Sequence, residues 1–212
     1  MKKVPYYSNP NNDWCALACY VMVGQYLLPD AGITFGKFKK LADAREGYVV
    51  WAFPVWSWLM DHGIIIHDQD VSSNEMWLKD GVDGLRNSVS EKEFAFYEKN
   101  TYDLNQVTNE LRKTSSHPNF TYTQKHVTWN EIIDSVKQPG ICDMTLNGRL
   151  LDTGEGFSVH RVVLIDITDK EVIFHNPNVR GDGAYQRKPI VEFRKAVESL
   201  SGPELCHYSV AS

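Results

Sequence analysis

A cysteine, a histidine and an asparagine in this sequence are of the types that together support thiol chemistry. Cys15 follows Asn11, Asn12 and Asp13 and opens a long apolar run. A thiol becomes a strong nucleophile when it ionises near neutral pH, and both a helix N-terminus and a neighbouring imidazolium lower its pKa. A buried structural thiol is the commoner role for a cysteine among apolar residues, and Cys19 fits that role better.

The histidine best placed to act as a base is His160. It follows the loop 154–158 and precedes the apolar run 161–165, so the pattern puts it at the beginning of a central strand. The next predicted strand, 171–174, is followed closely by Asn176. An antiparallel hairpin would bring Asn176 back to His160, where its amide could accept a hydrogen bond from the imidazole and fix the tautomer.

The element that must position Cys15 is a buried helix. Residues 14–28 are apolar on nearly every face, and the run ends at residues 29–32, Pro-Asp-Ala-Gly. Asn12 or Asp13 is expected to cap this helix, which puts Cys15 in its first turn, at the positive end of the helix dipole.

The rest of the chain divides into a helical part and a strand-rich part. Residues 35–63 predict one or two helices whose aromatic residues belong to the core. The polar stretch 72–119 predicts a helical insertion, or lobe. A short helix is expected at 129–136, and strands are expected at 64–66, 141–146, 159–167, 171–174 and 206–210, with a hairpin at 181–185. Helices followed by an antiparallel sheet indicate an α+β fold, and 212 residues fit one domain.

Four pieces of the sequence resemble the double-glycine, bacteriocin-processing peptidases, a bacterial family within the papain-like cysteine peptidase superfamily. They are Val4-Pro5-Tyr6-Tyr7-Ser8-Asn9, the helix of Cys15, the strand of His160, and Asn176-Pro177, and their order and spacing match. The similarity covers about the first 30 residues and about residues 129–197. It implies a papain-like fold, with the nucleophile on a central helix packed against a C-terminal antiparallel sheet.

The resemblance also implies a role for each residue. Cys15 would be the nucleophile, His160 its base and Asn176 the residue that orients the base. Asn9 would be the side-chain donor of an oxyanion hole, and the Cys15 backbone N–H the second donor. The chain departs from the family pattern in having Asn9 for glutamine, Ala16 and Val159 for glycines, and Asn176 for the more usual aspartate.

The expected function is that of a cysteine peptidase-like hydrolase that cleaves a peptide or amide bond of a peptide or protein substrate through an acyl-thioester, with no cofactor. Deamidation, transglutamination and acyl transfer use the same residues and stay open, because an amine can resolve the acyl-enzyme in place of water. A catalytically silent binding module is the third possibility. A zinc site of Cys15, Cys19, His160 and His175 is disfavoured, because structural zinc ligands usually come in paired knuckles.

Composition excludes several other classes. The formal net charge of −5 gives no basic footprint for nucleic acid. No signal-peptide pattern opens the chain and no run of about 18 apolar residues occurs, so a cytoplasmic location without a membrane span is the default expectation. Four cysteines without CxxC spacing indicate neither a disulfide scaffold nor a zinc ribbon. The oligomeric state stays open.

Overall fold

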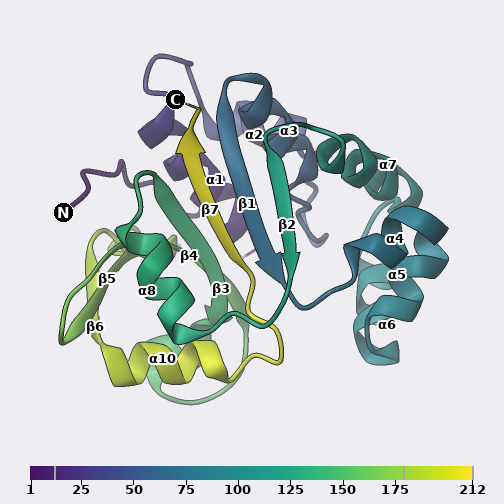
Figure 1. Cartoon of the computed structure of the whole chain (residues 1–212). Coiled ribbons are helices and arrows are strands. Elements are labelled where there is room, and N and C mark those ends of the chain that lie inside the picture. Colours follow the sequence, from purple (N-terminus) through teal and green to yellow (C-terminus); the bar gives the residue numbers. More distant parts are fainter. Residues whose placement is uncertain (12, 179, 212) are drawn as a thin grey trace.

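A seven-stranded sheet with helices on both faces forms the centre of the protein (Figure 1). The computed structural model describes residues 1–11, 13–178 and 180–211. The strand order is β2-β1-β7-β3-β4-β5-β6. β1 and β2 run parallel, whereas every other neighbouring pair is antiparallel. The α+β class is therefore confirmed, but the sheet is mixed and not purely C-terminal, because β1 and β2 come from the middle of the chain.

The bounds of the elements follow the predicted pattern in most places. The strands are β1 Ile64–Asp70, β2 Phe120–Gln124, β3 Ile141–Asn147, β4 Val159–Ile167, β5 Glu171–His175, β6 Gln186–Pro189 and β7 Leu205–Val210. The helices are α1 Cys15–Leu27, α2 Phe35–Leu41, α3 Phe53–Asp61, α4 Asn74–Asp80, α5 Val82–Ser88, α6 Glu91–Asn100, α7 Leu104–Ser115, α8 Trp129–Lys137, α9 Gly148–Thr153 and α10 Ile190–Glu198. Within the described ranges, no helix is both long and apolar enough to cross a membrane.

Helix α1 is buried, as its apolar sequence predicts, but its cap differs from the prediction. Trp14 occupies the N-cap position and makes no side-chain hydrogen bond to the first turn. The Asp13 carboxylate instead accepts a hydrogen bond from the Gly47 backbone N–H at 3.3 Å. Asn12 lies outside the described residues. Cys15 is therefore the first helical residue. The backbone N–H groups of this first turn have no partner in the N-cap side chain and stay available to an anion.

Two hydrophobic cores cover the two faces of the sheet, because successive strand residues point to opposite sides. One core contains α1 and α3 with Ile64, Val163 and Tyr208 of the sheet, and it includes the buried aromatic residues Phe53 and Trp56. The other core lies under α8 and α10 (Figure 1).

The polar stretch 72–119 is helical, with α4 to α7 side by side next to β2 (Figure 1). Its buried residues Trp77, Leu85, Phe94 and Leu111 belong to the same core as α1. The Thr114 hydroxyl also donates to the Phe53 carbonyl at 3.0 Å. The lobe is thus tied to the rest of the protein by shared apolar burial.

Candidate active site

The first turn of α1 lies against the beginning of β4, and this contact brings Cys15 beside His160. Cys19, one turn further along α1, donates its S–H to the Arg161 carbonyl at 3.4 Å. That bond fixes the helix against the strand. Cys15 is half-buried, whereas Cys19, Cys142 and Cys206 are buried, and all four cysteines are free thiols.

The His160 imidazole is held by Asn176. Nε2 of His160 and Oδ1 of Asn176 are 2.8 Å apart. An amide oxygen can only accept, so Nε2 carries the proton and Nδ1 is the nitrogen left unprotonated in the neutral ring. Nδ1 is then free to take a proton from the Cys15 thiol. The hairpin of β4 and β5 thus brings Asn176 to His160, as the sequence predicts.

The orientation of the Asn176 amide is fixed by its own partners. Its Nδ2 donates to Asp152 Oδ1 and to Gln186 Oε1, each at 3.2 Å. Both partners offer acceptor oxygens to the NH₂ group, so the opposite amide orientation would place oxygens against oxygens. Asn176 itself is 1% exposed, so the amide end of both bonds is shielded from solvent.

The N-terminal segment locks the backbone next to Asn176. The Tyr6 hydroxyl donates to the Asn176 carbonyl at 3.1 Å and accepts from the Gly183 N–H at 3.2 Å. A Cβ at Gly183 would stand 1.6 Å from the Asn176 carbonyl oxygen, so this approach requires glycine. The motif around Tyr6 therefore supports the site through the backbone.

The His175 ring is held by backbone groups and has a structural role. Its Nε2 lies 3.0 Å from the Val4 carbonyl, to which it can only donate, and its Nδ1 accepts from the Tyr185 N–H at 2.9 Å. Both ring nitrogens are thus engaged by backbone. Because Cys19 is also bonded to backbone, the structure does not assemble the zinc set considered from the sequence.

The environment favours charge separation between Cys15 and His160. Burial is the largest influence on the Cys15 pKa and raises it. The hydrogen bond and positive charge of His160, with smaller effects from Arg161, outweigh burial and leave this pKa below its ordinary value. Burial also opposes the imidazolium, but Cys15, Asn176 and Asp152 together raise the pKa of His160. Both shifts favour transfer of the thiol proton to the imidazole.

The other three thiols have the opposite environment. Burial raises the pKa of Cys142 to about 12. It also raises the pKa values of Cys19 and Cys206 well above the ordinary range, and nearby carboxylates add to the effect. Cys15 is the only one of the four cysteines whose pKa is lowered.

Asn9 is buried, with 4% of its surface exposed. Its Oδ1 accepts a hydrogen bond from the Asn11 N–H at 3.3 Å, in a turn that precedes α1. The role of Asn9 as an oxyanion donor stays a prediction.

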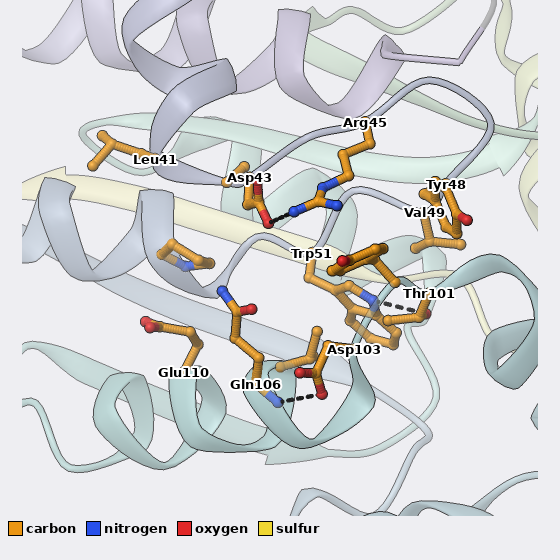
Figure 2. A pocket seen from close by; sticks show the side chains of 14 residues that line it. Leu41, Asp43, Arg45, Tyr48, Val49, Trp51, Thr101, Asp103, Gln106 and Glu110 are labelled. Carbon is orange, nitrogen blue, oxygen red and sulfur yellow. Dashed lines mark hydrogen bonds and ion pairs between the residues drawn. The ribbon is translucent and has the colours of Figure 1, made fainter.

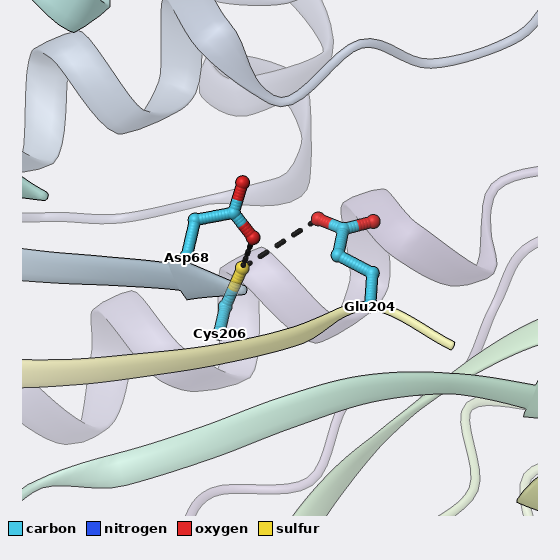
Figure 3. A group of neighbouring side chains, drawn as sticks. All are labelled: Asp68, Glu204 and Cys206. Atoms are coloured by element: carbon cyan, nitrogen blue, oxygen red, sulfur yellow. Dashed lines mark hydrogen bonds between the residues drawn. The ribbon is translucent and has the colours of Figure 1, made fainter. Parts of the chain in front are cut away.

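A buried charge network lies beside the site. Arg161, the residue after His160, donates to Asp143 Oδ1 at 2.6 Å and also pairs with Glu204. Figure 3 shows Glu204 next to Cys206, whose Sγ lies 3.1 Å from Asp68 Oδ1. Asp68, Glu204 and Cys206 have ligand atoms within 4.8 Å of one another, but the guanidinium already balances part of their charge. In the sequence, this network is indicated by two charged residues within apolar strand runs: Asp143 in 141–146 and Arg161 in 161–165.

A pocket lies between residues 41–54 and the beginning of α7 (Figure 2). Arg45 lies in its wall, paired with Asp43 at 2.9 Å and 3.5 Å from the centre of the Tyr102 ring. The hydrogen bond from Gly47 to Asp13 connects this segment to the chain just before Cys15. The sequence patterns did not predict this pocket.

Gly148, the first residue of α9, packs directly against His160. A Cβ at this position would lie 2.7 Å from the His160 Cβ and 3.1 Å from its Cγ. Gly148→Ala should therefore displace the imidazole. A misplacement of about 1 Å can cost roughly 10²-fold in rate, so we expect a tenfold to hundredfold slower alkylation of Cys15 near pH 6.

Gly36→Ala is the matched control, because a Cβ in that helix meets nothing within 4 Å. It should alkylate at the wild-type rate. An unchanged rate in a folded Gly148→Ala protein would contradict the packing of Gly148 on His160.

The site thus joins a cysteine at a helix start, a histidine at a strand start and an asparagine just after the next strand. No protein-family model matches the chain, and no curated protein matches it significantly.

Proposed function

We propose that the protein is a papain-like cysteine hydrolase that cleaves a peptide or amide bond. The observation that carries this proposal is the arrangement of Cys15 at the start of α1, beside an imidazole whose tautomer Asn176 fixes at 2.8 Å; this arrangement favours a lowered pKa for the thiol. The supporting observations are the helix start at Cys15 and the raised pKa values of the other three thiols.

The first half of the reaction forms an acyl-enzyme. The thiol proton moves to Nδ1 of His160, and the thiolate attacks the carbonyl carbon of the scissile amide. The tetrahedral oxyanion collapses, the C–N bond breaks, and the imidazolium gives its proton to the leaving amine. Asn176 holds the ring in place while it accepts and returns the proton.

The second half of the reaction releases the acid product. His160 takes a proton from water, and the resulting hydroxide attacks the thioester carbonyl. The C–S bond breaks, and the thiolate returns to its pairing with the imidazolium. The backbone N–H of Cys15 and the Asn9 amide are the proposed oxyanion donors in both halves.

Substrate choice is proposed to lie outside the triad. Phe157 and Val159, which precede His160 in the chain, are 64% and 62% exposed and offer apolar surface to a substrate. The pocket lined by Trp51, Tyr102 and Gln106 lies between the lobe and residues 41–54. Gly47 of this segment donates a hydrogen bond to Asp13. Because the lobe shares the main core, point variants such as Phe157→Ser test specificity better than deletion of the lobe.

Asn176→Ala should slow turnover without a comparable rise in KM. Hydrogen bonds to charged groups contribute about 1.5–3 kcal/mol, so a loss of roughly 10- to 150-fold in kcat is expected. An activated ester such as p-nitrophenyl acetate provides the assay before the natural substrate is known. Asn178→Ala, on the neighbouring surface, is the control.

A rise in KM alone would contradict an orienting role for Asn176. Incubating a peptide library with wild type and Cys15→Ala, and identifying fragments by mass spectrometry, tests the proposed reaction itself. New carboxyl termini that require Cys15 support hydrolysis. Products joined to an added amine, with no acid product, would assign the same thiol to acyl transfer.

A further inference from the structure

Asp152 lies behind Asn176, at the far side of the amide from His160. Its Oδ1 accepts from Asn176 Nδ2 at 3.2 Å, and Asn176 Oδ1 lies 2.8 Å from His160 Nε2. The three side chains thus form a continuous line of hydrogen bonds that ends at the ring facing Cys15.

The short helix α9 holds Asp152 in a defined place. Asn147 Oδ1 accepts from the N–H groups of Leu150 and Ser158, at 3.2 and 3.0 Å. At the other end, Gly154 adopts a left-handed conformation with φ 81° and bonds to the Leu150 carbonyl. Both ends of the helix are therefore fixed, and the carboxylate faces Asn176 without depending on a mobile loop.

The charge of Asp152 explains why an asparagine fits at position 176. An aspartate at position 176 would supply a negative charge directly behind the histidine. An aspartate in this chain would put two carboxylates about as close as the present 3.2 Å contact. Two carboxylates at that distance cannot both ionise readily. A neutral amide between Asp152 and His160 avoids this conflict and can donate to one while accepting from the other.

We propose that Asp152 is a positioning residue for His160: its carboxylate, together with the Gln186 side-chain oxygen, holds the Asn176 amide in the accepting orientation, and it supplies the negative charge that asparagine lacks. The inference rests on the proposed function and deepens it. Asp152 acts on the reacting atoms only through Asn176 and through its field. Because the carboxylate is exposed, its field is screened by salt.

The test measures two properties of the full chain: the His160 pKa by NMR, and the alkylation rate of Cys15 by iodoacetamide as a function of pH. Asp152→Asn keeps an acceptor oxygen but removes the charge, whereas Asp152→Ala removes both. Glu155→Gln, an exposed carboxylate in the adjoining loop, is the matched control for loss of charge.

Asp152→Asn should lower the His160 pKa and reduce Cys15 alkylation at pH 6 by about two- to tenfold, the range for one net hydrogen bond. The difference from wild type should shrink at 1 M salt. Asp152→Ala should slow Cys15 alkylation more than Asp152→Asn does. Glu155→Gln should have the alkylation rate and the His160 pKa of wild type. Identical pKa values and rates in wild type, Asp152→Asn and Asp152→Ala would overturn the inference.

A charge exchange gives a second test. Asn176→Asp alone should slow alkylation, whereas the double variant Asn176→Asp/Asp152→Asn should recover part of the rate, because the amide and carboxylate exchange places. A double variant no faster than Asn176→Asp would overturn the inference. If wild-type Cys15 is no more reactive than an ordinary thiol, the proposed function fails; if it is reactive and Asp152 has no effect, only the present inference fails.

Discussion

Cys15→Ala is expected to abolish the proposed hydrolysis, with a loss of about 10⁴-fold or more in kcat, because the proposed nucleophile is gone. The fold should persist, since Cys15 is half-buried and alanine is a good helix former. Hydrolysis of an activated ester gives the rate, and circular dichroism gives the state of the fold.

Cys19→Ala is the matched control, one turn further along the same helix. It should retain most of the activity and lose some stability, because its buried sulfur and the bond to the Arg161 carbonyl disappear. Activity that survives in Cys15→Ala but is lost in Cys19→Ala would move the nucleophile to Cys19. The raised pKa of the Cys19 thiol argues for the opposite outcome.

Arg161→Ala is expected to have the largest effect on the free energy of unfolding. The side chains of Arg161 and Asp143 are 5% and 0% exposed, and removing the guanidinium leaves a buried carboxylate without its cation. Breaking a buried pair in this way costs about 3–5 kcal/mol. Urea unfolding followed by tryptophan fluorescence measures the loss.

Arg187→Ala is the control for this experiment, because its pair with Glu171 lies at the surface. Exposed pairs contribute about 0–1 kcal/mol, so its unfolding curve should stay close to wild type. Equal losses in the two variants would contradict the assigned role of Arg161. Because Arg161 follows His160 in β4, the same network also holds the strand that carries the candidate base.

Periodic apolar patterns were sufficient to predict the elements that carry the three candidate residues. The continuous apolar run of α1 and the strand of His160 could be read directly, because buried elements leave long apolar runs. β6 was missed, since a short polar edge strand resembles a turn. α10 was also missed, although its residues Phe193, Ala196 and Val197 are buried at helical spacing.

The long-range contacts of the site left no comparable sequence signal. Asp152 is 24 residues from Asn176, on a six-residue helix with little periodicity. Nothing in the sequence distinguishes Gly148 from the other glycines of the chain, which has 14. Its importance follows only from its contact with His160. The expected Asp13 cap failed because the carboxylate finds a tertiary partner, Gly47, and tertiary partners are invisible to local capping rules.

The most direct measurement for the central claim is alkylation of the native protein by limiting iodoacetamide near pH 6, with the adduct mapped by mass spectrometry. The lowered pKa of Cys15 predicts preferential modification of this residue. Its thiolate should persist on the acid side of an ordinary thiol and be lost only as the pH falls through the lowered pKa. His160→Ala should remove the advantage. Preferential modification of Cys19, Cys142 or Cys206, or a Cys15 rate no faster than that of a free thiol, would contradict the account.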